Sequence, residues 1–166
     1  QGAVAVSFFF FLSGFVLSYK YNNQVNFISF YWKRIVRLYP LYVVTFLIVF
    51  ISVYLLQGKT HEPIYAIANF LGLHAWIPGY ALELNFPSWS LSVEFFFYAT
   101  FPAILWLFQK IKWQLFSLLM LTVWLIGLAQ HIYFVEVLYD PERYFLGQFI
   151  LYFPLFHLTT FLSGFY

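Results

Sequence analysis

Apolar residues fill five long runs of the chain, and short polar stretches separate these runs. The runs cover residues 2–19, 41–56, 89–108 and 113–130, and a last run that starts at Tyr144 and contains Pro154. A helix needs about 20 mostly apolar residues to cross roughly 30 Å of hydrocarbon. The pattern therefore predicts an all-α, polytopic membrane helix bundle with about five transmembrane spans. The first run is short for a span, so we expect it to begin before Gln1.

Residues 24–37 show a different, two-sided pattern. Aromatic and branched side chains gather on one side of a helix, whereas Lys33, Arg34 and Arg37 gather on the other. A helix of this kind lies in the membrane interface with its basic face toward headgroups or an anionic ligand. We expect a separate interfacial helix here. Pro40 would then stand at the start of the next span, where its missing N–H is no loss.

A long connection, residues 57–88, separates the second run from the third. It contains three glycines and three prolines, which are typical of turns and loops. Its middle part, residues 64–76, is apolar enough to lie on the membrane or to re-enter it. Periodicity does not decide between these alternatives.

Composition places the chain in lipid rather than in water. Of its 166 residues, 63% are hydrophobic, 27% are aromatic and only 8% are charged, against roughly 25% charged in soluble domains. A soluble domain of this length could not bury so many aromatic rings. The absence of cysteine excludes disulfides and thiolate metal sites within the chain, and a net charge of +2 does not point to nucleic acid.

Charged residues sort to the two ends of the predicted spans. If the Lys20 end is cytoplasmic, that side holds Lys20, Lys33, Arg34, Arg37, Lys110 and Lys112. The other side holds Lys59 and Arg143 together with the acids Glu62, Glu83, Glu136, Asp140 and Glu142. This distribution follows the positive-inside rule. We therefore expect a multi-pass protein of the cell (plasma or inner) membrane, with Lys20, Arg34, Arg37 and Lys110 on the cytoplasmic side.

One acidic residue, Glu94, lies within the third apolar run. Placing a carboxylate in lipid costs roughly 2.5 to 3.5 kcal/mol on insertion scales, so its presence favours a function. Ser90 precedes it by one helical turn and shares its face. Trp89 and Tyr98 are residue types that suit a membrane boundary. Glu94 could support catalysis or accept a proton, and it could also be a structural acid that pairs internally or reaches water.

Arg34 and Arg37 stand three residues apart, which places two guanidinium groups on one helical face. Arginine forms forked hydrogen bonds to phosphate, so the pair suits a nucleotide or phosphorylated donor at the cytoplasmic surface. The alternative is that both residues set topology and contact anionic lipid. Spacing alone does not exclude it.

The remaining polar residues carry weaker signals. The four histidines, His61, His74, His131 and His157, show no metal-ligand spacing, so we expect no metal site and assign them to packing or hydrogen bonding. The sequence Phe-Leu-Ser-Gly-Phe occurs at residues 11–15 and again at 161–165. We interpret it as recurrent small-residue packing between helices rather than as an internal repeat.

Three stretches together resemble the acyltransferase 3 family of multi-pass membrane O-acyltransferases. Residues 9–15 resemble its aromatic-rich Ser-Gly motif, in which Ser13 and Gly14 stand. Residues 33–40 resemble its Arg-x-x-Arg stretch, and residues 89–98 resemble its Trp-Ser-Leu-x-x-Glu segment, with Pro102 following. Residues 153–164 also resemble the region of the family's fifth span, so the likeness extends over nearly all of the chain.

The resemblance implies about ten transmembrane helices in the whole protein, of which this chain would hold roughly the first half without the first helix. It also implies acyl transfer from acyl-CoA, often acetyl-CoA, to a hydroxyl of a carbohydrate or glycolipid. Arg34 and Arg37 match the pair linked to acyl-CoA, and Ser13, Gly14, Ser90 and Glu94 match other motif positions. The family's catalytic histidine would lie upstream of Gln1. In the folded protein, Glu94 could orient the imidazole ring of that histidine.

We therefore interpret residues 1–166 as one membrane acyltransferase domain that is incomplete at both ends. Its expected partners are the lipid bilayer, acyl-CoA and a carbohydrate or lipid-linked acceptor, with no bound cofactor and no nucleic acid. The alternative is half of a membrane transporter, with Glu94 as a proton or ion relay. A scaffold without activity is a third possibility.

Overall fold

The structure is a computed structural model that describes residues 2–21, 26–58, 62–82, 84–138 and 144–165. Every regular element in these ranges is helical. The α-helices are α1 (Gly2–Lys20), α2 (Phe27–Gln57), α3 (Pro63–Phe70), α4 (Trp89–Phe108), α5 (Trp113–Tyr133), α6 (Tyr144–Tyr152) and α7 (Leu158–Ser163). Short 3-10 turns cover His74–Trp76, Phe86–Ser88 and Pro154–His157, and a π-helical turn, Phe134–Leu138, extends α5.

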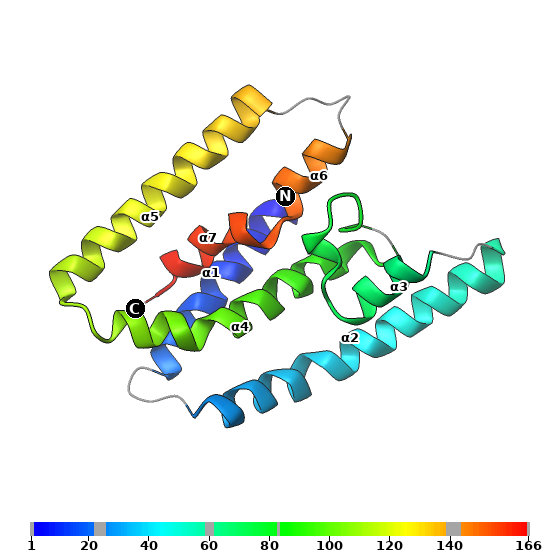
Figure 1. The fold of residues 1–166 in the computed structure, drawn as a ribbon, viewed down its shortest axis with the longest axis horizontal. Helices are drawn as coiled ribbons and strands as arrows, with labels where there is room; N and C mark the ends of the chain where they lie inside the picture. The colour runs from blue at the N-terminus through cyan, green and yellow to red at the C-terminus, as the bar shows by residue number, and fades with distance from the viewer. Residues whose placement is uncertain (1, 22–25, 59–61, 83, 139–143, 166) are drawn as a thin grey trace.

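Helix α4 runs through the middle of the molecule (Figure 1). It contacts α2 on one side and α1 on the other, and the turn at His74–Trp76 packs against it as well. Helix α7 packs against α1, and α5 lies at the outer edge, where it contacts α7. Residues of α4 therefore contribute most to the interior, including Val93, Phe97 and Phe101, which are fully buried.

The described helices confirm the predicted all-α membrane architecture. Three segments are long and apolar enough to span a bilayer by length and composition: Phe27–Leu56, Phe86–Phe108 and Trp113–Val137. A shorter apolar helix covers Val4–Lys20. Helix α4 has the predicted bounds, and α5 ends three residues after the predicted Gln130.

One prediction is wrong: within residues 24–37, the described part does not form an interfacial helix apart from the second span. Helix α2 begins at Phe27, where the Asn26 side chain caps it by accepting a 3.0 Å hydrogen bond from the Ser29 N–H, and continues to Gln57 with Pro40 inside. Proline is tolerated within membrane helices because neighbouring groups compensate for the lost hydrogen bond. One face of this part of α2 packs on protein, since Phe30 stacks on Phe101 of α4 at 5.4 Å between ring centroids. The predicted apolar side, with Phe27, Ile28, Trp32 and Ile35, is exposed.

The fifth apolar run is not one straight helix in the structure. Helix α6 ends at Tyr152, a 3-10 turn begins at Pro154, and α7 follows from Leu158. Pro154 has no N–H to donate, and the residue before it, Phe153, is extended (φ −69°, ψ 126°), as proline requires of its predecessor. The break turns α7 onto α1 and α5.

Helices α1 and α7 cross at very short range, and the two Phe-Leu-Ser-Gly-Phe segments form this crossing. A Cβ atom added to Gly14 would lie 1.9 Å from the carbonyl oxygen of Phe161, and one added to Gly164 would lie 2.0 Å from that of Phe11. The contact is reciprocal, because the glycine of each segment meets the first residue of the other. The predicted small-residue packing is confirmed.

Hydroxyl groups of α2 and α4 fasten the connection between them. Tyr39 Oη donates to the Phe70 carbonyl at 3.0 Å, Ser92 Oγ donates to the Gly72 carbonyl at 2.6 Å, and Tyr42 Oη donates to the Asn69 carbonyl. Asn69 and Phe70 are the last residues of α3 and Gly72 follows it, so these carbonyls lie where the helix runs out of donors of its own. Residues 69–74 are therefore held as a wall between α2 and α4.

Candidate functional site

Glu94 lies at the centre of the bundle and is 3% exposed. Its Oε1 atom accepts hydrogen bonds from two hydroxyls, Ser13 Oγ at 3.3 Å and Tyr98 Oη. Its Oε2 atom is buried and has no hydrogen-bond partner in the described part of the chain. The carboxylate is therefore held through one oxygen, and the other oxygen can accept a donor.

Helices α4 and α1 place the two hydroxyls next to Glu94. Tyr98 follows Glu94 by four residues on α4, so the two side chains share one helical face. Ser13 comes from α1, whose Phe10 packs edge-on against Trp89 and Phe97 of α4 at centroid distances of 6.1 and 5.2 Å. The aromatic contacts on α1 thus set the distance between Ser13 and the carboxylate.

Arg34 is buried beside this cluster, at 8% exposure. Its guanidinium carbon lies 5.4 Å from the ring centroid of Tyr98, 5.5 Å from that of Phe30 and 5.8 Å from that of Tyr21. At these distances a guanidinium group is attracted to the ring faces. Its Nη2 atom donates to Tyr21 Oη at 3.5 Å, and its Nε is buried without a partner among the described residues.

Arg37 differs from Arg34 although both stand on α2. Its side chain is exposed, whereas Arg34 is enclosed by rings. The positive charges of Arg37 and Arg34 are both close enough to attract the Glu94 carboxylate. The predicted pair is therefore one buried and one accessible guanidinium near the same acid.

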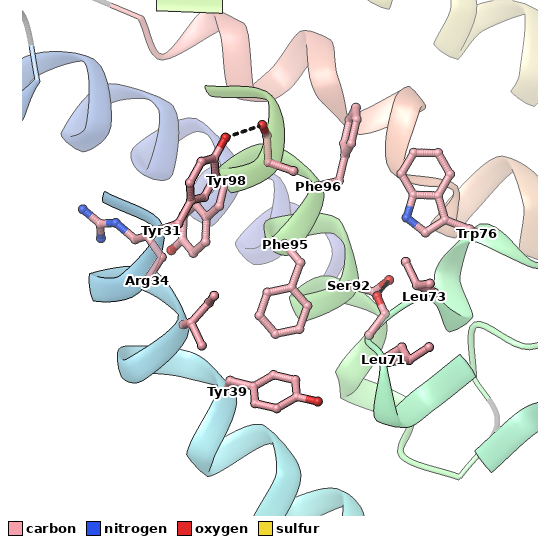
Figure 2. A pocket seen from close by; sticks show the side chains of 13 residues that line it. Tyr31, Arg34, Tyr39, Leu71, Leu73, Trp76, Ser92, Phe95, Phe96 and Tyr98 are labelled. Atoms are coloured by element: carbon pink, nitrogen blue, oxygen red, sulfur yellow. Dashed lines mark hydrogen bonds between the residues drawn. The ribbon is translucent and has the colours of Figure 1, made fainter. Parts of the chain in front are cut away.

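A cavity of about 570 Å³ adjoins the cluster. Figure 2 shows its walls: Tyr31, Arg34 and Tyr39 from α2, Ser92, Phe95, Phe96 and Tyr98 from α4, and Leu71, Leu73 and Trp76 from the connection. Its volume is within the range of small-molecule sites, about 300 to 1,000 Å³. Gly72 also lines it with φ +68°, and a Cβ there would lie 2.5 Å from the Phe95 ring, so the wall needs glycine at this position.

The structure brings some of the predicted site residues to Glu94 and leaves others away from it. Ser13 joins Glu94, and Gly14 packs against Phe161 next to it. Ser90 is not brought to the carboxylate, because its hydroxyl donates to the Pro87 carbonyl in its own turn at 3.0 Å. Trp89 and Tyr98, which we expected at a membrane boundary, are covered by protein atoms to 9% and 7% exposure.

Sequence reasoning missed the role of Tyr98. Tyr98 was interpreted as a boundary residue, although its four-residue spacing from Glu94 was a usable signal. His74 was assigned to packing or hydrogen bonding and does both: it stacks on Tyr42, and its Nε2 lies 3.0 Å from Ser88 Oγ. No group of three possible metal ligands occurs within the described residues. His61 and the outer charges Lys59, Glu83, Asp140, Glu142 and Arg143 lie outside the described residues.

The fold and the buried acid define a polytopic helical membrane protein with an internal polar site. Comparison with known proteins identifies its family: the family description "Acyltransferase domain" matches residues 1–166, and the chain belongs to this acyltransferase 3 family. The chain is also similar to "Acyltransferase MdmB" of Streptomyces mycarofaciens, with 37% identity over 118 residues, or 66% of the chain. The match spans about 30% of the length of that relative. No solved structure matches the chain.

Proposed function

We propose that the full-length protein transfers an acyl group from acyl-CoA, in the simplest case acetyl-CoA, to a hydroxyl of a carbohydrate or lipid-linked acceptor. Family membership supports acyl transfer and favours it over the transport alternative. The observation that carries the proposal is the buried Glu94 carboxylate with a free Oε2, beside Arg34 and an open cavity. The proposed site is in the membrane, with Arg34 and Arg37 on the cytoplasmic side.

The reaction needs a base and a stabilised carbonyl oxygen. The acceptor oxygen forms a bond to the acyl carbonyl carbon, and the carbon–sulfur bond of the thioester breaks. Coenzyme A leaves as a thiolate and takes up the proton that the acceptor hydroxyl loses. In this scheme the base is a histidine that the family resemblance places upstream of Gln1.

Glu94 is then a positioning residue for that histidine. Its Oε2 atom is free to accept an imidazole N–H, and its charge would stabilise the imidazolium that forms when the base takes a proton. Ser13 and Tyr98 hold the other oxygen, so the carboxylate cannot rotate away without losing both hydrogen bonds. This arrangement would fix the direction in which the free oxygen points.

Arg34 and Arg37 would bind the donor. Coenzyme A carries phosphates, and guanidinium groups bind phosphate through paired, charge-assisted hydrogen bonds. Arg37 is exposed and can reach a ligand outside the bundle, whereas Arg34 lines the cavity. The two residues would therefore contact different parts of the same donor.

The test is release of free coenzyme A thiol by purified full-length protein given acetyl-CoA and membranes of the source cells as acceptor. We expect Glu94→Gln to insert normally and to lose most of the activity, because the amide carries no charge to support the imidazolium. Glu136→Gln makes the same chemical change at an exposed acid and is the matched control. Near-full activity of Glu94→Gln at equal membrane abundance would remove Glu94 from the mechanism.

A further inference from the structure

We propose that the cavity between α2, α4 and residues 71–76 holds the hydrocarbon chain of the acyl donor and selects its length, favouring chains longer than acetyl. This inference rests on the proposed function, since it assumes acyl-CoA as the donor. It specifies the length of acyl chain that the donor site accepts. The argument uses the state of the hydroxyls in the walls, the position of Arg34 and the size of the cavity.

The hydroxyl groups in the walls are already engaged within the protein. Ser92 Oγ donates to the Gly72 carbonyl at 2.6 Å, Tyr39 Oη to the Phe70 carbonyl at 3.0 Å and Tyr31 Oη to the Ala99 carbonyl at 3.1 Å. The fourth, Tyr98 Oη, donates to Glu94. A sugar in this cavity would lose its hydrogen bonds to water, and the wall hydroxyls already donate their protons to protein acceptors. Burying a polar group without replacing its hydrogen bonds is unfavourable.

The surfaces that remain are rings and aliphatic side chains. Phe95, Phe96, Leu71 and Leu73 contribute them from two sides of the cavity (Figure 2). Such a surface binds hydrocarbon, because moving apolar groups out of water is favourable in proportion to the area removed. The occupant is therefore apolar along most of its length.

Arg34 determines which end of the donor enters the cavity. It lies in the wall of the cavity next to Tyr98, whose hydroxyl contacts the Glu94 carboxylate. A donor with a charged head and an apolar tail fits this arrangement when its tail lies in the cavity and its head lies toward the arginines. Its thioester would then lie near the Glu94 cluster.

The cavity is larger than an acetyl group requires. On α4 its lining runs from Ser92 to Ala99, two helical turns or roughly 10 Å. Its volume of about 570 Å³ would leave an acetyl donor with most of the apolar surface uncovered. A chain of four to eight carbons would reach further along this lining.

The experiment measures kcat/KM of the full-length enzyme for acetyl-, butanoyl-, hexanoyl- and octanoyl-CoA. Each added methylene should improve the wild type by about fourfold until the cavity is full. Ala99→Phe and Leu73→Trp fill the cavity from opposite walls and should lower the octanoyl-to-acetyl ratio by roughly tenfold or more, the value of two methylenes. Ala103→Phe is the matched control, since Ala103 is exposed one turn further along α4 and outside the lining.

The outcomes separate this inference from the proposed function. If transfer occurs but both filling variants change all donors alike, the cavity does not hold the acyl chain, and the proposed function stands. If no donor supports transfer, the proposed function fails and the inference with it. A photoactivatable phospholipid that labels the Ala99 wall and is not displaced by octanoyl-CoA would show that a bilayer lipid occupies the cavity, and would also overturn the inference.

Discussion

Glu94 is stabilised on one side only. Two hydroxyls donate to Oε1, whereas Oε2 is buried without a donor among the described residues. An unsatisfied buried polar atom destabilises a protein by about 1 to 3 kcal/mol, and more when it is charged. In the mechanism proposed above, the imidazole N–H of the upstream histidine would satisfy Oε2.

At Arg34 we predict that replacement by lysine weakens acyl-CoA binding. Lysine keeps the charge but loses the planar fork and the stacking on three rings. The loss of one charge-assisted hydrogen bond, about 1.5 to 3 kcal/mol, corresponds to roughly a tenfold or larger rise in Kd. Equilibrium binding of acyl-CoA to the purified full-length wild type and variant measures this change in Kd.

Lys33→Gln is the control for this prediction, because Lys33 is exposed and precedes Arg34 directly. It removes a positive charge from the same turn without touching the ring cluster. If Lys33→Gln and Arg34→Lys leave donor affinity equally unchanged at normal expression, Arg34 serves topology and lipid contact instead.

Sequence alone identified Glu94, Arg34 and Arg37 as residues of interest, because charges in apolar runs are easy to recognise. It did not identify which partner Glu94 takes. Spacing pointed to Ser90, whereas the contact with Ser13 depends on how α1 packs against α4, which no local pattern encodes. Burial of Tyr98 likewise follows from tertiary contacts that cover an aromatic residue otherwise typical of a membrane boundary.

At the scale of elements, the described part of the connection between α2 and α4 packs into the bundle through buried residues that include Asn69, His74 and Ala75. Side-chain hydroxyls satisfy its carbonyls at Asn69, Phe70 and Gly72. Further hydrogen bonds stabilise the end of the connection next to α4. Ser88 Oγ donates to the Asn85 carbonyl at 2.6 Å, and because its proton is used there, it accepts from the Nε2–H of His74. In neutral His74 this assignment places the ring proton on Nε2.

We predict that protonation of His74 destabilises the fold. Burial is the main cause that lowers its pKa to about 4, with the Ser88 hydrogen bond opposing it, whereas the ordinary value is about 6.5. The unfolded chain therefore takes up a proton first as the pH falls, and stability is lost between about pH 6.5 and pH 4. By linkage the loss between pH 7 and pH 5 is about 2 kcal/mol.

Thermal unfolding of the full-length protein in detergent at pH 7 and pH 5 measures this effect. His74→Gln keeps an N–H donor but does not titrate, so it should reduce the difference between the two pH values. His131→Gln, at an exposed histidine near the end of α5, is the control and should leave the difference in place. An equal pH effect in wild type and His74→Gln would show that His74 does not titrate in this range.

The elements themselves were largely predictable, and the exceptions have physical causes. Apolar runs located α1, α4 and α5 because lipid requires continuous helices of a certain length. The division of α2 at Pro40 was wrong, since the helix continues through the proline and Phe30 of its first part packs on α4. The break at Pro154 could not be located from hydropathy, which stays high across it.

At the scale of the whole molecule, the charges predict an orientation. Lys110 ends the predicted cytoplasmic side of α4, and Glu62 precedes α3 on the opposite side. Both are exposed, so cysteines at these positions would be accessible to reagents. The chain contains no cysteine of its own, which simplifies labelling of this region.

We predict that a cysteine at Lys110 of the full-length protein reacts only with reagents that cross the membrane, and that one at Glu62 reacts with impermeant reagents in intact cells. The positive-inside distribution is the reason. Permeabilised cells should label both positions and serve as the control. Labelling of the Lys110 position from outside would reverse the orientation and move the donor site away from the cytoplasm.

The close crossing of α1 and α7 has a consequence for how the protein is made. Gly14 and Gly164 stand at opposite ends of the described chain, and roughly 50 residues separate the end of α4 at Phe108 from the start of α7 at Leu158. At about 5 to 20 residues per second, a ribosome needs roughly three to ten seconds to add them. During this time Glu94 and Ser13 have both been synthesised, but the helix that fixes α1 has not. The nascent site therefore passes through an interval in which Glu94 and Ser13 have both been made but α7, which packs against α1, has not.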